Sequence, residues 1–481
     1  MLSPENFLRS PAFCLVLTSV FVCSSCSQVG VVMGSPPAEL KLPEAVQVRF
    51  NHRDGARFRS PLTGKWRNGD DLEAFLIESV NESRSELLVA VQELTLPGLA
   101  KALVAAQRRG VAVKLVMDNN YSLPWSKLHD ADLSSHQRLR LRRLTALADR
   151  NGDGKLSREE RDQGDAVAML KRHGIPLIDD REDGSRGSGL MHHKFVVIDR
   201  RRVITGSANF TSSGVHGDAG SARSRGNVNH LLSFDAPDLA ALFRSEFLQM
   251  WGDGPGGATN SRFGRQKDSV GIQGALVGDT KVEVLFAPHS PKRPDHGLRW
   301  IATQLEQGTK TIDMALFVFS EQSLANALGE HVNRGVAVRL LADPGFASRS
   351  YSEVLDLLGL SIPDRLCRLE AGNSPLRKPL EGVGIPRLSR GDKLHHKFAV
   401  IDNKKVITGS FNWSPSAAHT NDETLLVIHS RQLAQHFTRE MNRMWRGAEL
   451  GISPRIRQKL QRQRLKCGSG EQRQQDRLSV N

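Results

Sequence analysis

Two stretches of this chain repeat one pattern of residues that could attack a phosphorus centre and transfer protons. Each reads His-x-Lys, four residues, Asp, six residues and Gly-Ser-x-Asn, and the two copies align without any insertion or deletion. An imidazole can act as nucleophile or acid, an ammonium group can hold anionic oxygens, and hydroxyl and amide groups can donate further hydrogen bonds. The pattern therefore suits cleavage of a phosphodiester. Its polar positions are His192, Lys194, Asp199, Ser207 and Asn209 in the first copy, and His395, Lys397, Asp402, Ser410 and Asn412 in the second.

The elements that must position these groups are short buried strands. Residues 195–198 and 398–401 are uninterrupted apolar runs, which predict a strand covered on both faces. Alternation along that strand puts the His and Lys of each copy on one side, at the mouth of a sheet. The intervening residues, His193 and His396, point the other way, and we expect them to serve packing.

The pattern resembles the HKD signature of the phospholipase D superfamily, of which two copies in one chain are the monomeric form. The resemblance implies a displacement at phosphorus in two steps. One histidine forms a phosphohistidine, and the other protonates the leaving alcohol and then activates water or an acceptor alcohol. We assign the first role to His192 and the second to His395. Lys194 and Lys397 would neutralise the non-bridging oxygens, with added donors at Ser207, Asn209, Ser410 and Asn412.

The resemblance also makes Asp199 and Asp402 members of the catalytic set, although their spacing shows no contact with an imidazole. An orienting acid is expected at Glu423, because Asn-Asp-Glu at 421–423 resembles the family's downstream N-x-E element. The first half has Asn229 where that acid would stand, so the two histidines need not be oriented alike. The chemistry requires no metal ion or other cofactor.

The duplication covers a whole domain. The helix-to-strand junction at 109–118 corresponds to 334–343, and both halves close on Met-Trp. Strands that alternate with helices indicate an α/β fold. The resemblance implies two tandem phospholipase D-like α/β(/α) sandwich domains, related by pseudo-twofold duplication, whose signatures meet at their interface. We place them at 45–251 and 281–446, joined by a Gly- and Ser-rich linker at 252–280.

The first half carries extra residues with the pattern of a calcium loop. Residues 149–160 read D-x-N-x-D-G-x-L-S-x-x-E, a complete EF-hand loop, within an insert at about 136–172. A single hand holds calcium weakly, and an acidic turn that binds nothing tightly is the alternative. We expect a structural or modulatory role. We also hypothesise that the longer insert at 121–187, which precedes His192, gates access to the site and is ordered by calcium. The ligands would be the side chains of Asp149, Asn151, Asp153, Ser157 and Glu160 and the backbone carbonyl of Lys155.

The N-terminus has the features of an export signal. An apolar run at 13–22 is followed by small residues and Cys26, which resembles a bacterial lipoprotein signal with Cys26 as the lipidated residue; an uncleaved anchor is the alternative. We expect the protein to be exported from the cytoplasm, as a membrane-anchored lipoprotein or a periplasmic or secreted protein. The five cysteines indicate no disulfide framework. We assign residues 1–26 to the signal peptide, 27–44 to a linker and 447–481 to a basic tail.

The charge of the chain favours polyanionic partners. Over 481 residues, Lys and Arg outnumber Asp and Glu by 66 to 52, a net charge of +14. The leading hypothesis is a phospholipase D-type phosphodiesterase that cleaves or transfers the phosphodiester of phospholipids at a membrane surface. The alternatives are a secreted non-specific endonuclease acting on nucleic acid, a cardiolipin synthase-like transferase, and a catalytically dead calcium-binding scaffold. The lack of a recognised nucleic-acid module counts against the nuclease. No obligate protein partner is indicated.

Overall fold

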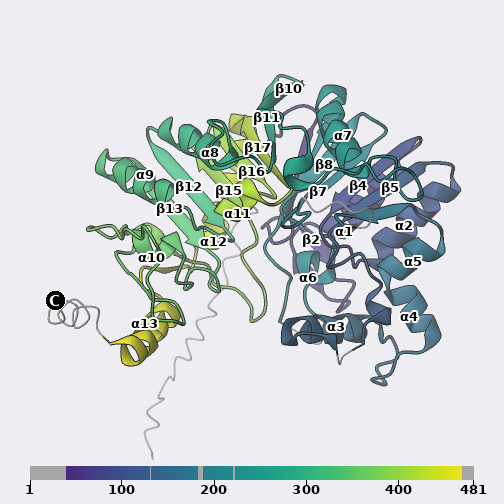
Figure 1. Ribbon diagram of the computed structural model, residues 1–481, viewed down its shortest axis with the longest axis horizontal. Coiled ribbons are helices and arrows are strands. Elements are labelled where there is room, and N and C mark those ends of the chain that lie inside the picture. The colour runs from purple at the N-terminus through teal and green to yellow at the C-terminus, as the bar shows by residue number, and fades with distance from the viewer. Residues whose placement is uncertain (1–39, 130–131, 182–187, 220, 222, 469–481) are drawn as a thin grey trace, which may run out of the picture. The chain divides into compact units, whose positions relative to one another are not determined.

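The first half of the chain, coloured purple to teal in Figure 1, forms a seven-stranded sheet. Its strand order is β1-β9-β8-β7-β4-β5-β6. The computed structural model describes residues 40–129, 132–181, 188–219, 221 and 223–468. The signal peptide assigned to 1–26 and most of the linker assigned to 27–44 lie outside these residues. The strands of the first sheet are β1 (Val46–Phe50), β4 (Glu86–Val91), β5 (Ala112–Met117), β6 (Leu177–Asp179), β7 (Lys194–Ile198), β8 (Arg202–Gly206) and β9 (His230–Asp235).

The second half forms a nine-stranded sheet that repeats this topology. Its order is β10-β11-β17-β16-β15-β12-β13-β14-β18, so the seven strands between β10 and β18 follow the order of the first sheet. β4 and β5 are parallel in the first sheet, and β12 and β13 are parallel in the second. The signature strands β7 and β15 pair antiparallel with β4 and β12, respectively. The strands are β10 (Gln273–Val277), β11 (Thr280–Ala287), β12 (Thr311–Leu316), β13 (Ala337–Ala342), β14 (Val383–Ile385), β15 (Lys397–Ile401), β16 (Lys405–Gly409), β17 (Glu423–His429) and β18 (Glu449–Leu450).

This shared topology confirms the predicted α/β fold with two tandem halves. The two apolar runs became β7 and β15, and every residue in both strands is buried. These strands are enclosed because helices pack against both faces of each sheet. A small separate sheet pairs β2 (Arg57–Arg59) with β3 (Trp66–Asn68).

Helices lie on both faces of each sheet. The buried side chains of α7 (Pro237–Trp251) and α12 (Arg431–Trp445) share one apolar core with strands of both sheets, which joins the halves. A second core lies between the first sheet and helices α1 (Leu72–Asn81), α2 (Pro97–Arg108) and α5 (Ala166–Arg172). A third lies between the second sheet and helices α8 (Gly297–Glu306), α9 (Gln322–Asn333), α10 (Glu353–Leu357) and α11 (Pro415–His419).

The segments predicted as linker and tail contain regular structure. The linker at 252–280 includes a 3-10 turn (Gly264–Gln266) and all of β10, which extends the second sheet. The tail at 447–481 includes β18 and the helix α13 (Pro454–Cys467). The insert predicted at about 136–172 contains three helices. α3 (Ser135–Ala148) precedes the loop, and α4 (Arg158–Gly164) and α5 follow it and are separated at Asp165.

The expectation of no disulfide is corrected by a bond between Cys367 and Cys467. The two cysteines are 100 residues apart, and such a pair cannot be recognised from sequence spacing alone. The bond fastens the end of α13 to the loop that follows α10. Among the residues that the structure describes, no helix combines the length and the apolar character needed to span a bilayer.

Candidate active site

The two signatures meet where short strand extensions from each half pair with the other half. Residue Met191 forms a parallel bridge with Asp422, and Val228 forms one with Leu394. The backbone N–H of His192 donates to the carbonyl of Asp422 at 2.9 Å, and that of His395 donates to the carbonyl of Val228 at 3.1 Å. Each histidine is therefore positioned by backbone from the opposite half.

Both histidines line one cavity of about 550 Å³. Asn209 and Asn412, the last residues of the two signatures, line it as well. The Oδ1 atoms of these two asparagines are buried and accept no hydrogen bond from the part of the chain that is described. They are therefore available to a bound molecule or to water.

His192 is oriented by a carboxylate. Its Nδ1 lies 2.7 Å from Oε2 of Glu423, which also accepts from the hydroxyl of Ser410 at 2.6 Å. Burial raises the pKa of Glu423 to about 7, against the opposing effect of the Lys194 charge. Burial, together with Lys194 and Lys397, holds the pKa of His192 well below its ordinary value. A neutral imidazole that donates from Nδ1 leaves the lone pair on Nε2 free.

His395 is oriented by an amide instead. Its Nδ1 lies 3.0 Å from Oδ1 of Asn229, whose Nδ2 donates to the carbonyl of Gly214 at 2.8 Å. That second bond fixes the amide with its oxygen toward His395, so the imidazole must donate from Nδ1. Burial and the charges of Lys397 and Lys194 lower the pKa of His395 well below its ordinary value. Within the part of the chain that is described, neither histidine uses Nε2 for a hydrogen bond. Of the two, His192 is the one whose Nδ1 faces a group that can carry a negative charge.

The two signature lysines lie beneath the histidines. Lys194 and Lys397 are buried, and each Nζ donates to the carbonyl of the histidine two residues before it, at 2.6 and 2.7 Å. Burial lowers the pKa of Lys194 to about 7. Burial and the like charge of Lys194 lower the pKa of Lys397 well below its ordinary value. A bound anion would relieve this repulsion. Neither lysine lines the cavity in this structure, and the cationic residues that do line it are Arg140, Arg143 and Lys393.

The role assigned to Ser207 and Ser410 is corrected by the structure. Both are fully buried and bind the orienting residues: Ser207 donates to Oδ1 of Asn229 at 2.8 Å, and Ser410 donates to Glu423. They therefore cannot donate to a phosphate in the cavity. Both serines directly follow a strand that ends near the site, which the sequence could show. Their partners, Asn229 and Glu423, are more than ten positions away and could not be identified from the spacing.

Asp199 and Asp402 do not contact an imidazole either, which corrects their place in the catalytic set. Each follows its strand in a turn with positive φ, at 51°. Asp199 accepts from the backbone N–H groups of residues 84–86, and Asp402 from those of residues 309–311. Although burial raises it, these N–H groups bring the pKa of Asp402 to about 2. Both carboxylates fasten the start of the neighbouring strand, so their role is structural.

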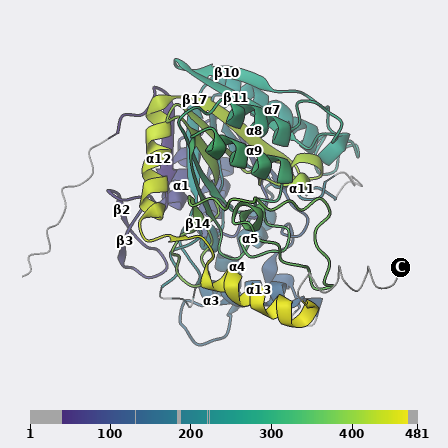
Figure 2. The same ribbon diagram turned by 90° about the vertical axis from the view of Figure 1, so that its left-hand side faces the viewer.

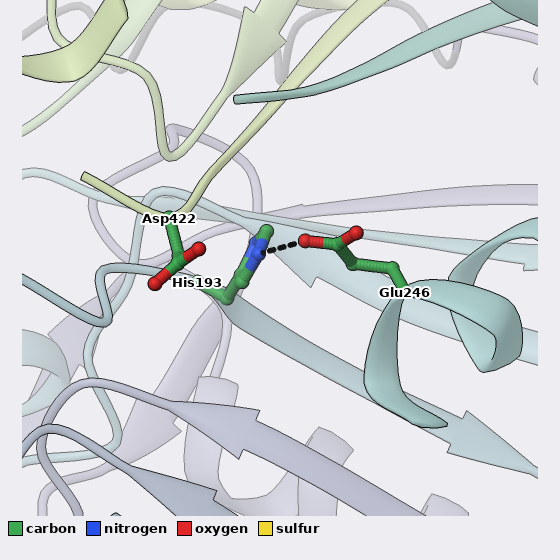
Figure 3. Close-up of side chains that lie close together, drawn as sticks. All are labelled: His193, Glu246 and Asp422. Carbon is green, nitrogen blue, oxygen red and sulfur yellow. Dashed lines mark hydrogen bonds and ion pairs between the residues drawn. The ribbon is translucent and has the colours of Figure 1, made fainter. Parts of the chain in front are cut away.

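The middle histidines of the signatures belong to buried networks, as expected. His193 binds Thr424 of the second half and Glu246 of its own half, at 2.8 and 3.0 Å. His396 binds His230 of the first half and Glu440 of its own half. Figure 3 shows His193, Glu246 and Asp422 close together. Such a cluster could hold a cation, but the buried ammonium group of Lys267 already pairs with both carboxylates. Lys267 lies in the segment predicted as a linker, so its burial was not expected from the sequence.

Two residues that sequence analysis missed make the cavity asymmetric. Gln92 follows β4 and accepts from Asn209 at 3.2 Å. Phe317 follows β12 at the corresponding place, and its ring centroid lies 4.7 Å from that of His395. Both residues line the cavity directly after a buried strand, which is the signal that could have identified them.

Residues 149–160, which the sequence predicts to be a calcium loop, are held together by hydrogen bonds within the loop. Asp149 accepts from the N–H groups of Gly152 and Gly154, at 2.8 and 2.9 Å, and both glycines have positive φ. Glu160 accepts from Arg150 and Ser157, both at 2.9 Å. The bonds from Ser157 are the main reason that the pKa of Glu160 falls to about 2. The remaining side-chain oxygens, of Asn151 and Asp153, accept from backbone N–H groups within the loop. This set of hard oxygen donors, with three carboxylates, fits calcium.

The helix that enters this loop forms a wall of the cavity. Leu139, Arg140, Arg143, Leu144 and Leu147 of α3 all line it. Arg140 pairs with Glu93 at 2.6 Å and Arg143 with Asp218 at 3.0 Å, which ties α3 to the body of the first half. The loop begins at Asp149, directly after the last residue of α3, so a change in the conformation of the loop would shift the end of α3.

Comparison with known proteins gives a family match over both halves. Residues 76–251 and 301–445 match the family described as "Cardiolipin synthase, PLD-like domain". A curated relative, the mitochondrial cardiolipin hydrolase of Xenopus tropicalis, is 30% identical over 141 residues, which cover 29% of this chain and 57% of that protein. The phospholipase D of Rickettsia felis is 29% identical over 158 residues, which cover 33% of this chain and 66% of that protein.

The matched regions thus span between half and two thirds of these relatives. Among solved structures, the phosphatidylserine synthase of Haemophilus influenzae covers a larger part of this chain. It is 12% identical with a TM-score of 0.49, over 84% of this chain and 89% of that one.

Proposed function

The chain belongs to the PLD-like domain family of cardiolipin synthases, and from this premise we propose that it is a phospholipase D-type phosphodiesterase. One observation carries the proposal: two histidines from opposite halves line one cavity, and each is held through Nδ1 so that Nε2 is free. A pair of imidazoles that face one cavity, with Arg140, Arg143 and Lys393 also in its lining, can divide nucleophilic and acid–base work.

The reaction would proceed in two balanced steps. Nε2 of His192 attacks phosphorus and the bond to the leaving alcohol breaks, while His395 gives that alcohol a proton. His395 then takes a proton from water, whose oxygen attacks phosphorus and releases His192. The assignment of His192 as nucleophile rests on Glu423, because a carboxylate stabilises the positive charge of a phosphohistidine better than the amide of Asn229 does. A bound phosphodiester would raise the pKa of His395 by offsetting the charges of the two lysines.

Phospholipid is the substrate class we favour. The relatives are named for cardiolipin hydrolysis and for phospholipase D activity. The cavity also has an apolar wall suited to a lipid, formed by Leu139, Leu144, Leu147, Phe317 and Phe346. The net charge of +14 suits a nucleic acid as well, which keeps a nuclease as the second candidate. Water or an alcohol could complete the second step, so transfer to an alcohol follows the same chemistry as hydrolysis.

A paired turnover assay tests this proposal. We expect head-group release from phosphatidylglycerol or phosphatidylcholine vesicles, no cleavage of single-stranded DNA, and no turnover by His395→Ala. DNA cleavage without lipid turnover would make the protein a nuclease. If neither substrate is cleaved and no phosphohistidine forms, the chain is a scaffold that has kept the fold.

We also propose that the loop at 149–160 binds calcium and that the bound ion stabilises the α3 wall of the cavity. The proposal rests on the oxygen donors of the loop and on the residues of α3 that line the cavity. Calcium is not part of the chemical steps. The bound ion would fix the position of α3, and α3 would in turn control access to the cavity that it lines.

The substitution Glu160→Gln is expected to weaken calcium binding about tenfold, because it removes one of three carboxylates from the ligand set. Binding would be measured by titration calorimetry, together with the calcium-dependent rise in the unfolding temperature. Glu159→Gln is the matched control, since this neighbour binds Gln163 and not the loop. Equal calcium affinity in the two variants would show that the loop is not the site. Turnover that is unchanged by chelation would remove the gating role.

Export from the cytoplasm remains our proposal for localisation. The apolar run at 13–22 and Cys26 support it from the sequence. The disulfide between Cys367 and Cys467 adds support, because structural disulfides persist in oxidising compartments and are rare in the cytosol.

A further inference from the structure

Helix α13 carries charged and apolar groups that the proposed catalysis does not use. Its fourteen residues include six Lys or Arg and no Asp or Glu. Its net charge of +6 is therefore a large part of the +14 of the whole chain. The exposed cations of the helix are Arg455, Arg457, Arg462, Arg464 and Lys466.

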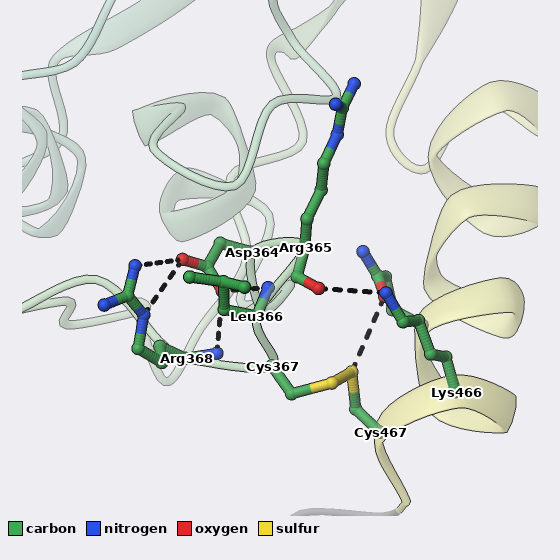
Figure 4. Close-up of a disulfide and its surroundings, with 8 residues drawn as sticks. Asp364, Arg365, Leu366, Cys367, Arg368, Lys466 and Cys467 are labelled. Carbon is green, nitrogen blue, oxygen red and sulfur yellow. Dashed lines mark hydrogen bonds and ion pairs between the residues drawn. A yellow bond between two sulfur atoms is a disulfide. The ribbon is translucent and has the colours of Figure 1, made fainter.

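The helix is held to the second half along one face (Figure 2). Ile456 is buried in the third apolar core, and Leu460 packs against that core. Lys466 donates from Nζ to the carbonyl of Arg365 at 2.9 Å, beside the disulfide that ends the helix (Figure 4). These attachments fix which face of α13 is turned to solvent, and that face carries the cations.

Exposed leucines accompany the cations. Leu366, Leu369 and Leu465 are 69%, 59% and 83% exposed. Each lies within two residues of one of the bonded cysteines, so the disulfide holds the three in one region of the surface. Exposed leucines among Lys and Arg are the composition of a surface that lies in a membrane interface, where the leucines reach the acyl boundary and the cations meet phosphate groups.

We propose that α13 and residues 365–369, here called the basic–leucine surface, bind the surface of an anionic phospholipid membrane. A polynucleotide would match the cations but would leave the leucines in water. The surface also contains no aromatic side chain on which bases could stack. A lipid surface uses both kinds of group.

The basic–leucine surface lies beside the catalytic cavity. Nζ of Lys459, on α13, donates to the carbonyl of Ser348. Ser348 stands between Phe346 and Tyr351, which both line the cavity. Membrane binding would therefore bring the cavity close to its substrate. This consequence rests on the proposed function, whereas the binding itself does not.

The proposal is tested by vesicle sedimentation, without any measurement of turnover. The full chain would carry Cys26→Ser, to exclude an acyl anchor, and His192→Ala, to exclude consumption of the lipid. We expect sedimentation with vesicles of phosphatidylcholine and phosphatidylglycerol, little with phosphatidylcholine alone, and release by salt. Arg457→Gln, Arg462→Gln and Arg464→Gln together should weaken binding about a hundredfold, since each cation at an anionic surface contributes about fivefold.

Two further variants make the test specific. A control with the same loss of charge, Lys65→Gln, Arg108→Gln and Arg334→Gln, changes exposed cations on other elements and should bind within about twofold of the parent. Leu465→Ser should weaken binding about tenfold without altering the unfolding temperature, because this side chain is exposed in the free protein. Equal weakening by both triple variants, or no effect of Leu465→Ser, would overturn the proposal. So would loss of single-stranded DNA binding in the first triple variant with vesicle binding intact. Binding without turnover in the active chain would instead reject the proposed function alone.

Discussion

Replacement of His192 by alanine is expected to lower kcat by a factor on the order of 10⁵, as removal of a catalytic nucleophile does. The Nε2 of His192 is free and its Nδ1 is held by Glu423, so the residue is prepared to form a bond to phosphorus. Its side chain lines an open cavity, so its loss creates no enclosed void. The unfolding temperature should therefore stay within about 2 °C of the parent. Turnover of phosphatidylglycerol vesicles and thermal unfolding check the two expectations.

His395→Ala is the matched control, because it removes the partner histidine from the same cavity. With bis(p-nitrophenyl) phosphate, the leaving group needs no proton, so this variant should still form the covalent intermediate. It should then accumulate that intermediate, because water is no longer activated. Peptide mapping after an alkaline quench would find the phosphoryl group at His192. A phosphoryl group at His395 in the parent protein would reverse the assigned roles.

Duplication made much of the fold predictable from the sequence. The second copy of each segment confirms the boundaries of the first, and uninterrupted apolar runs predicted the enclosed strands β7 and β15. Structure was harder to predict in segments that have no counterpart in the other half, because the hydrophobic pattern could not be checked against a second copy. The strand β10 and the buried Lys267 occur in a segment that has the composition of a linker. The pairing of Cys367 with Cys467 depends on contacts between segments 100 residues apart.

The candidate site was predictable in its residues but not in their partners. The signature identified His192 and His395, and the structure brings both to one cavity. Spacing could not show that Ser207 faces Asn229, or that Asp199 faces the start of β4. These contacts join residues that are more than twenty positions apart, and only the folded sheets bring them together. A polar residue that recurs beside a site can thus be structural, as the two aspartates are.

The asymmetry of the site arises because the orienting groups cross between the halves. The histidine of the first half receives Glu423 from the second, and the histidine of the second half receives Asn229 from the first. A single Glu-to-Asn difference between two otherwise similar halves therefore separates the two histidines chemically. One can bear a positive charge beside a carboxylate, and the other is only oriented. This difference underlies the assignment of nucleophile and acid.

Glu423→Gln is accordingly expected to lower kcat by about 10²- to 10³-fold. Oε2 accepts from His192 and Ser410, and Oε1 lies 3.4 Å from Nδ2 of Asn421, so a glutamine oxygen can keep the two strong contacts while the charge is lost. Because burial raises the pKa of Glu423 to about 7, the parent should lose activity as the pH falls through about 7 and the carboxylate is protonated. The variant has no carboxylate to protonate, so that acidic limb of its kcat profile should be absent.

Asn229→Ala separates the loss of charge from the loss of orientation. The amide of Asn229 is neutral, so its removal costs His395 its orientation and no electrostatic stabilisation, and we expect about a tenfold loss of kcat with the acidic limb retained. Steady-state turnover across the pH range, with unfolding temperatures for both variants, compares the two sides of the cavity. A larger loss in Asn229→Ala than in Glu423→Gln would mean that the amide supports the more demanding step. An acidic limb that persists in Glu423→Gln would assign the titration to another group, and the carboxylate would then serve only to orient His192.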